Sequence, residues 1–343
     1  GKNGYLSLHT DNIKATIRSN EDVRRFCEHY KAAFSDFGDE MDRVLIDQAE
    51  TLSVPRTEEE LAASIFKRFK DIPLLDPYQA YEIFEGAFPG TAGDLELIQT
   101  EGMKAVTQVD PNMVVKKKNG KDVEVQEGWK GHILPFDLVE RVCLKDALNA
   151  LTEKENELAK IPSSYDELIE SLSEDDKDSI SDALNDTNDA FVVKNIKGVI
   201  KTLKEDGADN KTLIQTLRQA EALNDKEKKL KAEIKSDEES LHLKTKDTIK
   251  SLTDALVRQL LHEKWATPVE TGILSLADSM VDAFTKSIET LAQKYSVTMN
   301  DLEREIRDTE ESLSSMLSEL TGTDADMAGI HELQKLLGGE AHE

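Results

Sequence analysis

The sequence predicts a mainly α-helical protein: a compact helical front part with a small β-hairpin, then a long antiparallel helical hairpin, or coiled-coil-like bundle. Three observations lead to this fold class. Apolar residues recur at helical spacing along most of the 343 residues. An Asn119-Gly120 pair stands between two strand-like segments, which is the strongest short signal of a hairpin. Only two of the eight prolines follow Pro135, so the back of the chain has few helix breakers.

Composition and pattern divide the chain into five regions. These are a compact helical region (1–90), a loop and β-hairpin (91–135), helices with an acidic connector (136–208), a long helical hairpin (209–322) and a tail that we expect to be frayed (323–343). The formal net charge is −26, and residues 1–135 contribute only −7 of it. An acidic surface repels phosphate, so the chain as a whole is a poor candidate for binding DNA through its surface charge.

The front region predicts a short strand at residues 5–8 and helices that begin near Asn20 and at Asp76. Asp76 can cap its helix, and Pro77 suits the first helical position. The glycine-rich segment 86–94 follows a segment with a helical period and not a buried strand. It therefore predicts a turn, and not a loop that holds a nucleotide or S-adenosylmethionine.

Residues 109–131 predict the β-hairpin, because both central residues of a type I′ turn need a positive φ and Asn-Gly supplies them. The expected register pairs Lys118 with Lys121, Lys117 with Asp122, Lys116 with Val123, and Val114 with Val125. The pair of Lys117 and Asp122 is a favourable cross-strand arrangement.

Four lysines near the hairpin tip are the candidate contacts with a DNA backbone or with another subunit: Lys116, Lys117, Lys118 and Lys121. The segment from Lys116 to Lys130 has a net charge of only +2. Several phosphate contacts are needed for binding at physiological salt. We therefore expect a lysine-tipped hairpin that resists edge-to-edge aggregation and that meets DNA only within a larger complex.

Two long helices are predicted, one from about Lys211 to Trp265 and a second that follows a break at Ala266-Thr267-Pro268 and runs to Tyr295. A narrow apolar seam runs along them. Its residues are Leu223, Leu230, Ile234, Leu241, Ile273, Leu276, Met280, Ile288 and Leu291. Such a seam buries little by itself, so it implies a further helix, in this chain or in a partner.

Two other helices adjoin this predicted pair. The helix before it is expected to end at Pro162. A last helix is predicted from Thr298, with one apolar side. That side consists of Leu302, Ile306, Leu313, Met316 and Leu320.

No catalytic or metal-binding group of residues is evident. His262 opens an HEKWA segment like that of a zinc-protease helix, but the fifth residue is Ala266 and not histidine. The acidic connector at 182–189 lacks the central Gly and the closing Glu of a calcium loop, so we expect a solvated loop there. Cys27 and Cys143 are far apart in sequence, which fits a reducing cytoplasm. We predict no catalytic residue, cofactor or metal in this chain, and no membrane association, since no apolar run approaches 18 residues.

The segment "AGDLELIQTEGMKAVTQVDPNMVVKKKNGKDVEVQEGWKGHILPFDLV", residues 92–139, resembles the C-terminal region of the modification (M) subunit of type I restriction-modification systems. Similar segments on both sides are "YLSLHTDNIKATI", "PLLDPYQAYEIF", "NDAFV", "LKTKDTIKSLTDALVRQLLHEKW" and "LAQKYSVTMNDLEREI". The resemblance implies methyl transfer from S-adenosylmethionine to a flipped adenine in DNA by the whole subunit. It also implies that helical parts of the M subunit pack against helices of the specificity (S) subunit, in a system with a restriction (R) subunit.

The catalytic tetrapeptide of that family, Asn or Asp followed by Pro-Pro and Tyr or Phe, is absent, since the chain has no Pro-Pro pair. "FPGTAGD" does not match the family's cofactor loop either. The resemblance therefore implies a non-catalytic C-terminal portion, inactive alone, with the methyltransferase domain upstream of Gly1. The alternative is a free-standing coiled-coil adaptor without enzymatic activity. An upstream reading frame with the Pro-Pro tetrapeptide would favour the first hypothesis.

Overall fold

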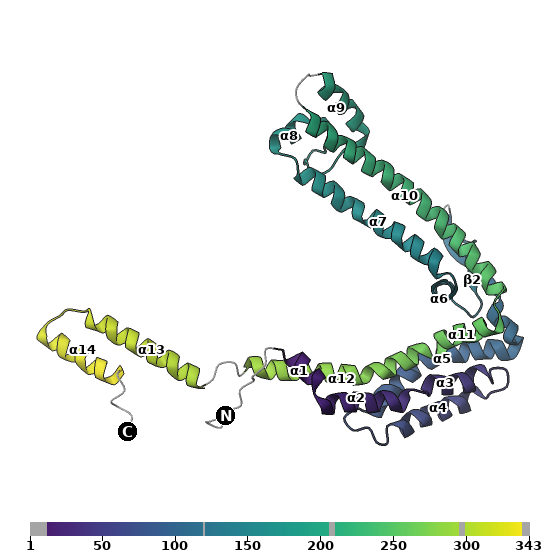
Figure 1. Ribbon diagram of the computed structural model, residues 1–343, viewed down its shortest axis with the longest axis horizontal. Coiled ribbons are helices and arrows are strands. Elements are labelled where there is room, and N and C mark those ends of the chain that lie inside the picture. The colour runs from purple at the N-terminus through teal and green to yellow at the C-terminus, as the bar shows by residue number, and fades with distance from the viewer. Residues whose placement is uncertain (1–11, 119–120, 206–209, 295–298, 338–343) are drawn as a thin grey trace. The chain divides into compact units, whose positions relative to one another are not determined.

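Helices make up most of the computed structural model, which describes residues 12–118, 121–205, 210–294 and 299–337 (Figure 1). Within these residues the strands form one two-stranded antiparallel sheet. The prediction of a mainly α-helical fold with a small β-hairpin is confirmed. The strand expected at residues 5–8 lies outside the described residues.

Two compact units divide the chain. The central unit comprises Phe34–Lys70 and Asp76–Ile273. The terminal unit comprises the described residues of Gly1–Ala33, Asp71–Leu75 and Leu274–Glu343. Segments from both ends of the chain thus belong to one unit. The five regions expected from the sequence follow one another along the chain and do not predict this.

The elements follow one another in the order of the sequence. Those of the central unit are α3 (Phe37–Met41), the π-helix η1 (Asp42–Ile46), α4 (Val54–Arg68), α5 (Pro77–Glu101), the 3₁₀-helix η2 (Met103–Thr107), β1 (Val109–Lys118), β2 (Lys121–Gly131), α6 (Phe136–Cys143), α7 (Lys145–Glu170), α8 (Glu174–Ser179), the 3₁₀-helix η3 (Ser181–Ala183), α9 (Val193–Glu205), α10 (Lys211–Lys250) and α11 (Asp254–Trp265). The remaining elements are α1 (Ile13–Ser19), α2 (Glu21–Phe34), α12 (Thr267–Lys294), α13 (Met299–Ser318) and α14 (Asp324–Leu337). Helix α12 begins in the central unit and continues in the terminal unit.

Helix α5 begins as the sequence predicts. The Asp76 carboxylate accepts a hydrogen bond from the Tyr78 backbone N–H at 3.0 Å, and Pro77 is the first helical residue. The buried face of the helix has side chains mostly three or four positions apart. Its apolar residues are Ala80, Phe84, Phe88, Leu95 and Ile98. This face packs beside α4 in the core of the central unit.

The turn expected at residues 86–94 is a wrong prediction, because α5 continues unbroken through this segment. Glycine and proline disfavour a helix interior by about 1 and 3 kcal/mol, respectively. Each buried Phe or Leu on the opposite face stabilises the helix by about 2 kcal/mol. Packing of Phe84, Phe88 and Leu95 therefore outweighs the local preference of the glycines for a turn.

The hairpin has the register that the sequence predicts. Val114 faces Val125, Lys117 faces Asp122, and the register shifts once, at a bulge between Pro111 and Met113. The turn residues 119–120 lie outside the described part of the chain. The hairpin packs against α10, so strands close in sequence are supported by a helix from much further along the chain.

The long helical hairpin has different members from the expected ones. Helix α10 pairs with α7, which runs antiparallel to it (Figure 1). The Lys154 ammonium of α7 lies 2.8 Å from Asp237, and the Tyr165 hydroxyl donates to the Ala220 carbonyl at 3.3 Å. Leu151 and Ile161 of α7 bury one apolar cluster with α10. The α10 side chains in this cluster are Leu230, Ile234 and Leu241.

Two expected helix boundaries are wrong. Pro162 lies inside α7 and does not end it. The first long helix stops at Lys250, and Thr253 caps α11 by accepting from the Leu256 backbone N–H at 3.4 Å. A break does occur where it was expected, since α11 ends at Trp265 and α12 begins at Thr267. Pro268 is the second residue of α12, where its missing N–H removes no helical bond.

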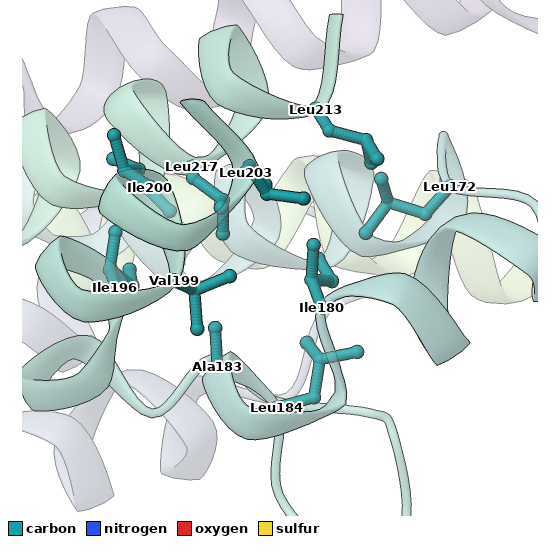
Figure 2. Close-up of a cluster of buried hydrophobic side chains, with 11 residues drawn as sticks. Leu172, Ile180, Ala183, Leu184, Ile196, Val199, Ile200, Leu203, Leu213 and Leu217 are labelled. Carbon is teal, nitrogen blue, oxygen red and sulfur yellow. The ribbon is translucent and has the colours of Figure 1, made fainter. Parts of the chain in front are cut away.

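A second apolar cluster lies at the far end of the α7–α10 pair and includes η3 and α9 (Figure 2). Its buried residues are Leu172, Ile180, Ala183, Leu184, Ile196, Val199, Ile200, Leu203, Leu213, Leu217 and Ala220. The acidic connector passes through this cluster with an isolated bridge between Leu184 and Phe191. The connector therefore contributes to a core and is not a solvated loop throughout.

The tail contains helix α14 where we expected a frayed end. The Asp326 carboxylate accepts from the Thr323 backbone N–H at 3.0 Å and from the Thr323 hydroxyl at 2.6 Å. Gln334 then donates to the Ser314 carbonyl of α13 at 2.9 Å. A Thr-x-x-Asp capping pattern is thus the local signal that the sequence analysis overlooked.

Candidate functional site

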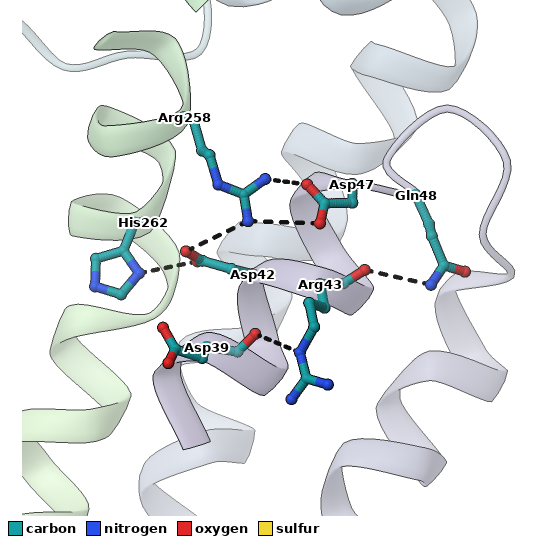
Figure 3. Close-up of polar contacts among 7 residues, drawn as sticks. All are labelled: Asp39, Asp42, Arg43, Asp47, Gln48, Arg258 and His262. Atoms are coloured by element: carbon teal, nitrogen blue, oxygen red, sulfur yellow. Dashed lines mark hydrogen bonds and ion pairs between the residues drawn. The ribbon is translucent and has the colours of Figure 1, made fainter. Parts of the chain in front are cut away.

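The histidine that opens the HEKWA segment belongs to an ion-pair network in the central unit (Figure 3). His262 Nδ1 lies 2.9 Å from an Asp42 carboxylate oxygen, and Arg258 pairs with both Asp42 and Asp47. Although π-helical turns often mark functional sites, Asp42 of η1 and Asp47 directly after it are both paired with side chains of α11. We therefore assign this network a structural role, namely holding η1 against α11.

Within the described ranges, no group of three or more His, Cys, Asp or Glu side chains is arranged to hold a metal ion. In the same residues, no helix is both long enough and apolar enough to cross a membrane. Burial raises the pKa of both thiols, Cys27 and Cys143. A raised thiol pKa lowers the thiolate fraction, so neither cysteine has the environment of a catalytic nucleophile.

The base of the hairpin is anchored on α10 by a backbone contact. The Trp129 N–H donates to His242 Nε2 at 2.9 Å. Gly128, directly before it, has a φ of +77°, and a Cβ at this position would lie 2.6 Å from His242 Nε2. Only glycine allows this approach without strain. The sequence analysis did not identify this anchor, because His242 and Trp129 are 113 positions apart.

Two lysines of α10 cover one part of the Trp129 ring. The Lys246 ammonium lies 4.5 Å from the ring centroid and the Lys250 ammonium 5.8 Å. Both distances are within the range of cation–π attraction. Beside the ring is an open cavity of about 420 Å³, lined in part by Phe136, Glu140 and His242. The Trp129 ring thus already attracts two cations of its own chain, Lys246 and Lys250.

A histidine clamp lies at the start of the hairpin. His132 Nδ1 is 2.7 Å from an Asp110 carboxylate oxygen of β1, and its Nε2 is 3.4 Å from the Glu101 carboxylate at the end of α5. The hydrogen bond to Asp110 raises the pKa of His132, and the charge of Glu101 acts in the same direction. Protonation of His132 therefore strengthens the connection between α5 and β1.

The candidate contact lysines are partly neutralised within the hairpin. The Lys116 ammonium lies 2.5 Å from the Glu127 carboxylate, and Lys117 stands opposite Asp122. The side chains of Lys118 and Lys121 lie outside the described part of the structure. The hairpin therefore does not present Lys116 and Lys117 as uncompensated positive charges.

The predicted partner-helix seam is divided by the fold. Leu230, Ile234 and Leu241 pack on α7, and Ile273 is fully buried. These four side chains are covered by this chain and are not open to a partner. Leu291 is 54% exposed. The other members of the seam are half-buried: Leu223, Leu276, Met280 and Ile288.

Helix α13 presents an apolar seam that the sequence analysis did not include among its site residues. Apolar residues recur there at the four-then-three spacing of a heptad seam, with Thr309 as the one polar member. The apolar members, with exposed fractions of 43–63%, are Leu302, Ile306, Leu313 and Met316 of the helix and Leu320, two residues after its end. The heptad spacing was visible in the sequence, but only the structure distinguishes exposed from covered positions. We call this row of side chains the α13 seam.

Comparison of the chain with protein-family models, with curated proteins and with solved structures gave no match.

Proposed function

We propose that this chain is the non-catalytic C-terminal portion of the M subunit of a type I restriction-modification system, and that it mediates assembly with the S subunit. The observation that carries the proposal is the exposed α13 seam, since α13 begins in a segment that resembles the helical tail of that family. In the whole enzyme, S-adenosylmethionine and DNA would be bound through other parts. Contact with the R subunit would follow assembly.

The energetic argument for assembly concerns the exposed apolar side chains of the terminal unit. Phe284 and Leu291 of α12 are also exposed, at 51% and 54%. Burying a Leu or Ile side chain stabilises a complex by about 1.5–3 kcal/mol before the entropy of association is subtracted. Several such side chains in one row therefore favour a helix laid along them.

The test is co-expression of the chain with an S subunit from the same genome, followed by co-purification and sedimentation. We expect a stable complex, and Ile306→Asp, which buries a charge in the seam, should weaken it at least about tenfold. The control is Asp308→Asn, which removes a charge from an exposed position outside the seam. An S subunit that never co-purifies with the chain would refute the proposal.

A second measurement addresses the absence of the catalytic motifs. We expect calorimetry to detect no binding of S-adenosylmethionine to the chain alone, because neither family motif is present. A stoichiometric binding isotherm would contradict the proposal. If neither an S subunit nor the cofactor binds, the chain acts instead as a coiled-coil adaptor without an enzymatic parent.

A further inference from the structure

The α13 seam has glutamates on both of its flanks. In heptad terms its apolar side chains occupy the a and d positions, and Glu305 and Glu310 occupy the flanking g and e positions. Glu305 and Glu310 line one shallow surface depression of about 330 Å³ together with Leu302, Ile306 and Leu313. The carboxylates are therefore placed where they meet the flanks of any helix that docks on the seam.

The positive charges of α13 lie off the seam. Arg304 and Arg307 fall at f and b positions, and Arg304 is 3.5 Å from the Asp301 carboxylate. Helix α14 does not cover the seam either. Gln334 of α14 donates to the Ser314 carbonyl and the Ser318 hydroxyl, which lie on another face of α13. The seam thus has an apolar centre and two acidic edges.

From this arrangement we infer that the α13 seam binds an amphipathic helix of a partner protein whose flanking positions carry Lys or Arg. Charges at e and g positions determine partner choice in paired helices. A second copy of this chain is disfavoured. In a parallel pair glutamates at g would face glutamates at e, and in an antiparallel pair they would face their own counterparts. The overall charge of −26 adds to this repulsion.

This inference rests on the proposed function, because it states the chemistry of the partner at the same seam. It goes further because it assigns the choice of partner to the glutamates at the edges of the seam and the attraction to the apolar side chains at its centre. The apolar side chains supply the free energy of burial, and the glutamates select among helices that are equally apolar.

The test uses the full chain and two synthetic helical peptides of three heptads. Both peptides have Leu and Ile at a and d; one has Lys and the other Glu at e and g. We expect the lysine peptide to bind at least about tenfold more tightly in low salt, with a preference that shrinks as salt rises. Equal affinity for the two peptides would overturn the inference, and so would a wild-type chain that dimerises in sedimentation velocity.

Charge-reversed variants separate the role of the edges from that of the fold. The double variant Glu305→Lys and Glu310→Lys should reverse the preference in favour of the glutamate peptide. Simple loss of helix α13 would abolish both affinities instead, so a reversal identifies the edges. The matched control, Glu311→Lys, makes the same charge change at an f position and should leave the preference unchanged; a reversal there would overturn the inference.

The outcomes distinguish this inference from the function on which it rests. If the lysine peptide is preferred but no S subunit binds, the proposed function fails and the basic-partner inference stands. If the S subunit binds but the peptides are not discriminated, the assembly role stands and the inference about the edges fails.

Discussion

Asp94 illustrates how one carboxylate can join elements that are distant in sequence. It is 9% exposed, and its Oδ2 lies 2.5 Å from the Lys264 ammonium and 2.8 Å from the Trp265 indole nitrogen. Lys264 also donates to the Ile133 carbonyl at 2.6 Å. The contacts connect α5, the segment after the hairpin, and α11. A charge in such a position is tolerated because its partners satisfy it.

The first prediction concerns removal of this carboxylate charge. Asp94→Asn should lower the free energy of unfolding by about 3 kcal/mol, because it leaves the Lys264 charge without its counter-ion in a largely buried place. The measurement is the urea midpoint and slope. The matched control is Glu96→Gln, an exposed site on the same helix, for which a change below about 0.5 kcal/mol is expected. Equal effects of the two variants would contradict the assigned role of Asp94.

The second prediction concerns pH and His132. Its folded pKa is raised above the ordinary value of 6.5 by Asp110 and Glu101. A raised pKa means that protonated His132 stabilises the fold fully below about pH 6.5 and that this stability is lost as pH rises through the folded pKa. Thermal midpoints of the wild type should therefore fall over that interval.

His132→Gln is the variant that isolates this effect. We expect its thermal midpoint to depend less on pH above about 6.5 than the midpoint of the wild type does. Exposed His29 of α2 provides the control, and His29→Gln should keep the wild-type slope. An unchanged slope in His132→Gln would show that the clamp does not carry the pH dependence.

At the scale of elements, α5 is a helix that its own glycines weaken. A Cβ added at Gly86, Gly90 or Gly93 would have no heavy atom within 4 Å from outside the helix. All three positions are exposed, while the opposite face supplies the packing. The helix therefore forms because of tertiary contacts and against its local preference.

The third prediction follows from that open space. Gly90→Ala should raise the free energy of unfolding by about 0.5–1 kcal/mol, because alanine reduces the freedom of the unfolded chain and fits the helix. Gly272→Ala on α12 is the contrasting variant, since its Cβ would lie 2.8 Å from Ile83 Cγ2. We expect Gly272→Ala to leave the free energy of unfolding without that increase, or to lower it. Thermal unfolding measures both, and a loss of stability in Gly90→Ala would mean that this face is covered.

Pairing of the elements depends on more than their periodicity. Helices α10 and α12 both have apolar seams, and the sequence cannot say which helix covers which seam. Leu230, Ile234 and Leu241 find Leu151 and Ile161 on α7, which also supplies Lys154 to the acids of α10. That pairing keeps α7 helical through Pro162.

At the scale of the whole molecule, the charge of the chain favours some classes of partner over others. The chain is strongly acidic, and the described lysines near the hairpin tip already face Glu127 and Asp122. The glutamates at the edges of the α13 seam lie beside it, while the two arginines of that helix lie off it. The net field therefore disfavours nucleic acid and favours a basic protein partner.

The fourth prediction tests this balance. The isolated chain should not bind a labelled duplex in fluorescence anisotropy below about 10 µM at roughly 0.1 M salt, because too few phosphates can be neutralised. Lys116→Gln with Lys117→Gln should change nothing in that assay. A submicromolar affinity that falls with rising salt, and that this double variant weakens, would assign the hairpin a direct DNA contact. In the assembled complex the same double variant tests the hairpin's proposed contact with a DNA backbone.

Local signals in the sequence determined where several elements begin and how the hairpin pairs. The Asp76 cap, Pro77 and the Asn119-Gly120 signal act within a few residues, so spacing and residue type suffice to predict them. Tertiary structure alone decided that α7 covers α10, that α5 continues through its glycines, and that His242 anchors Trp129. These outcomes depend on free energies of packing between segments far apart in the chain, and no local pattern contains those contacts.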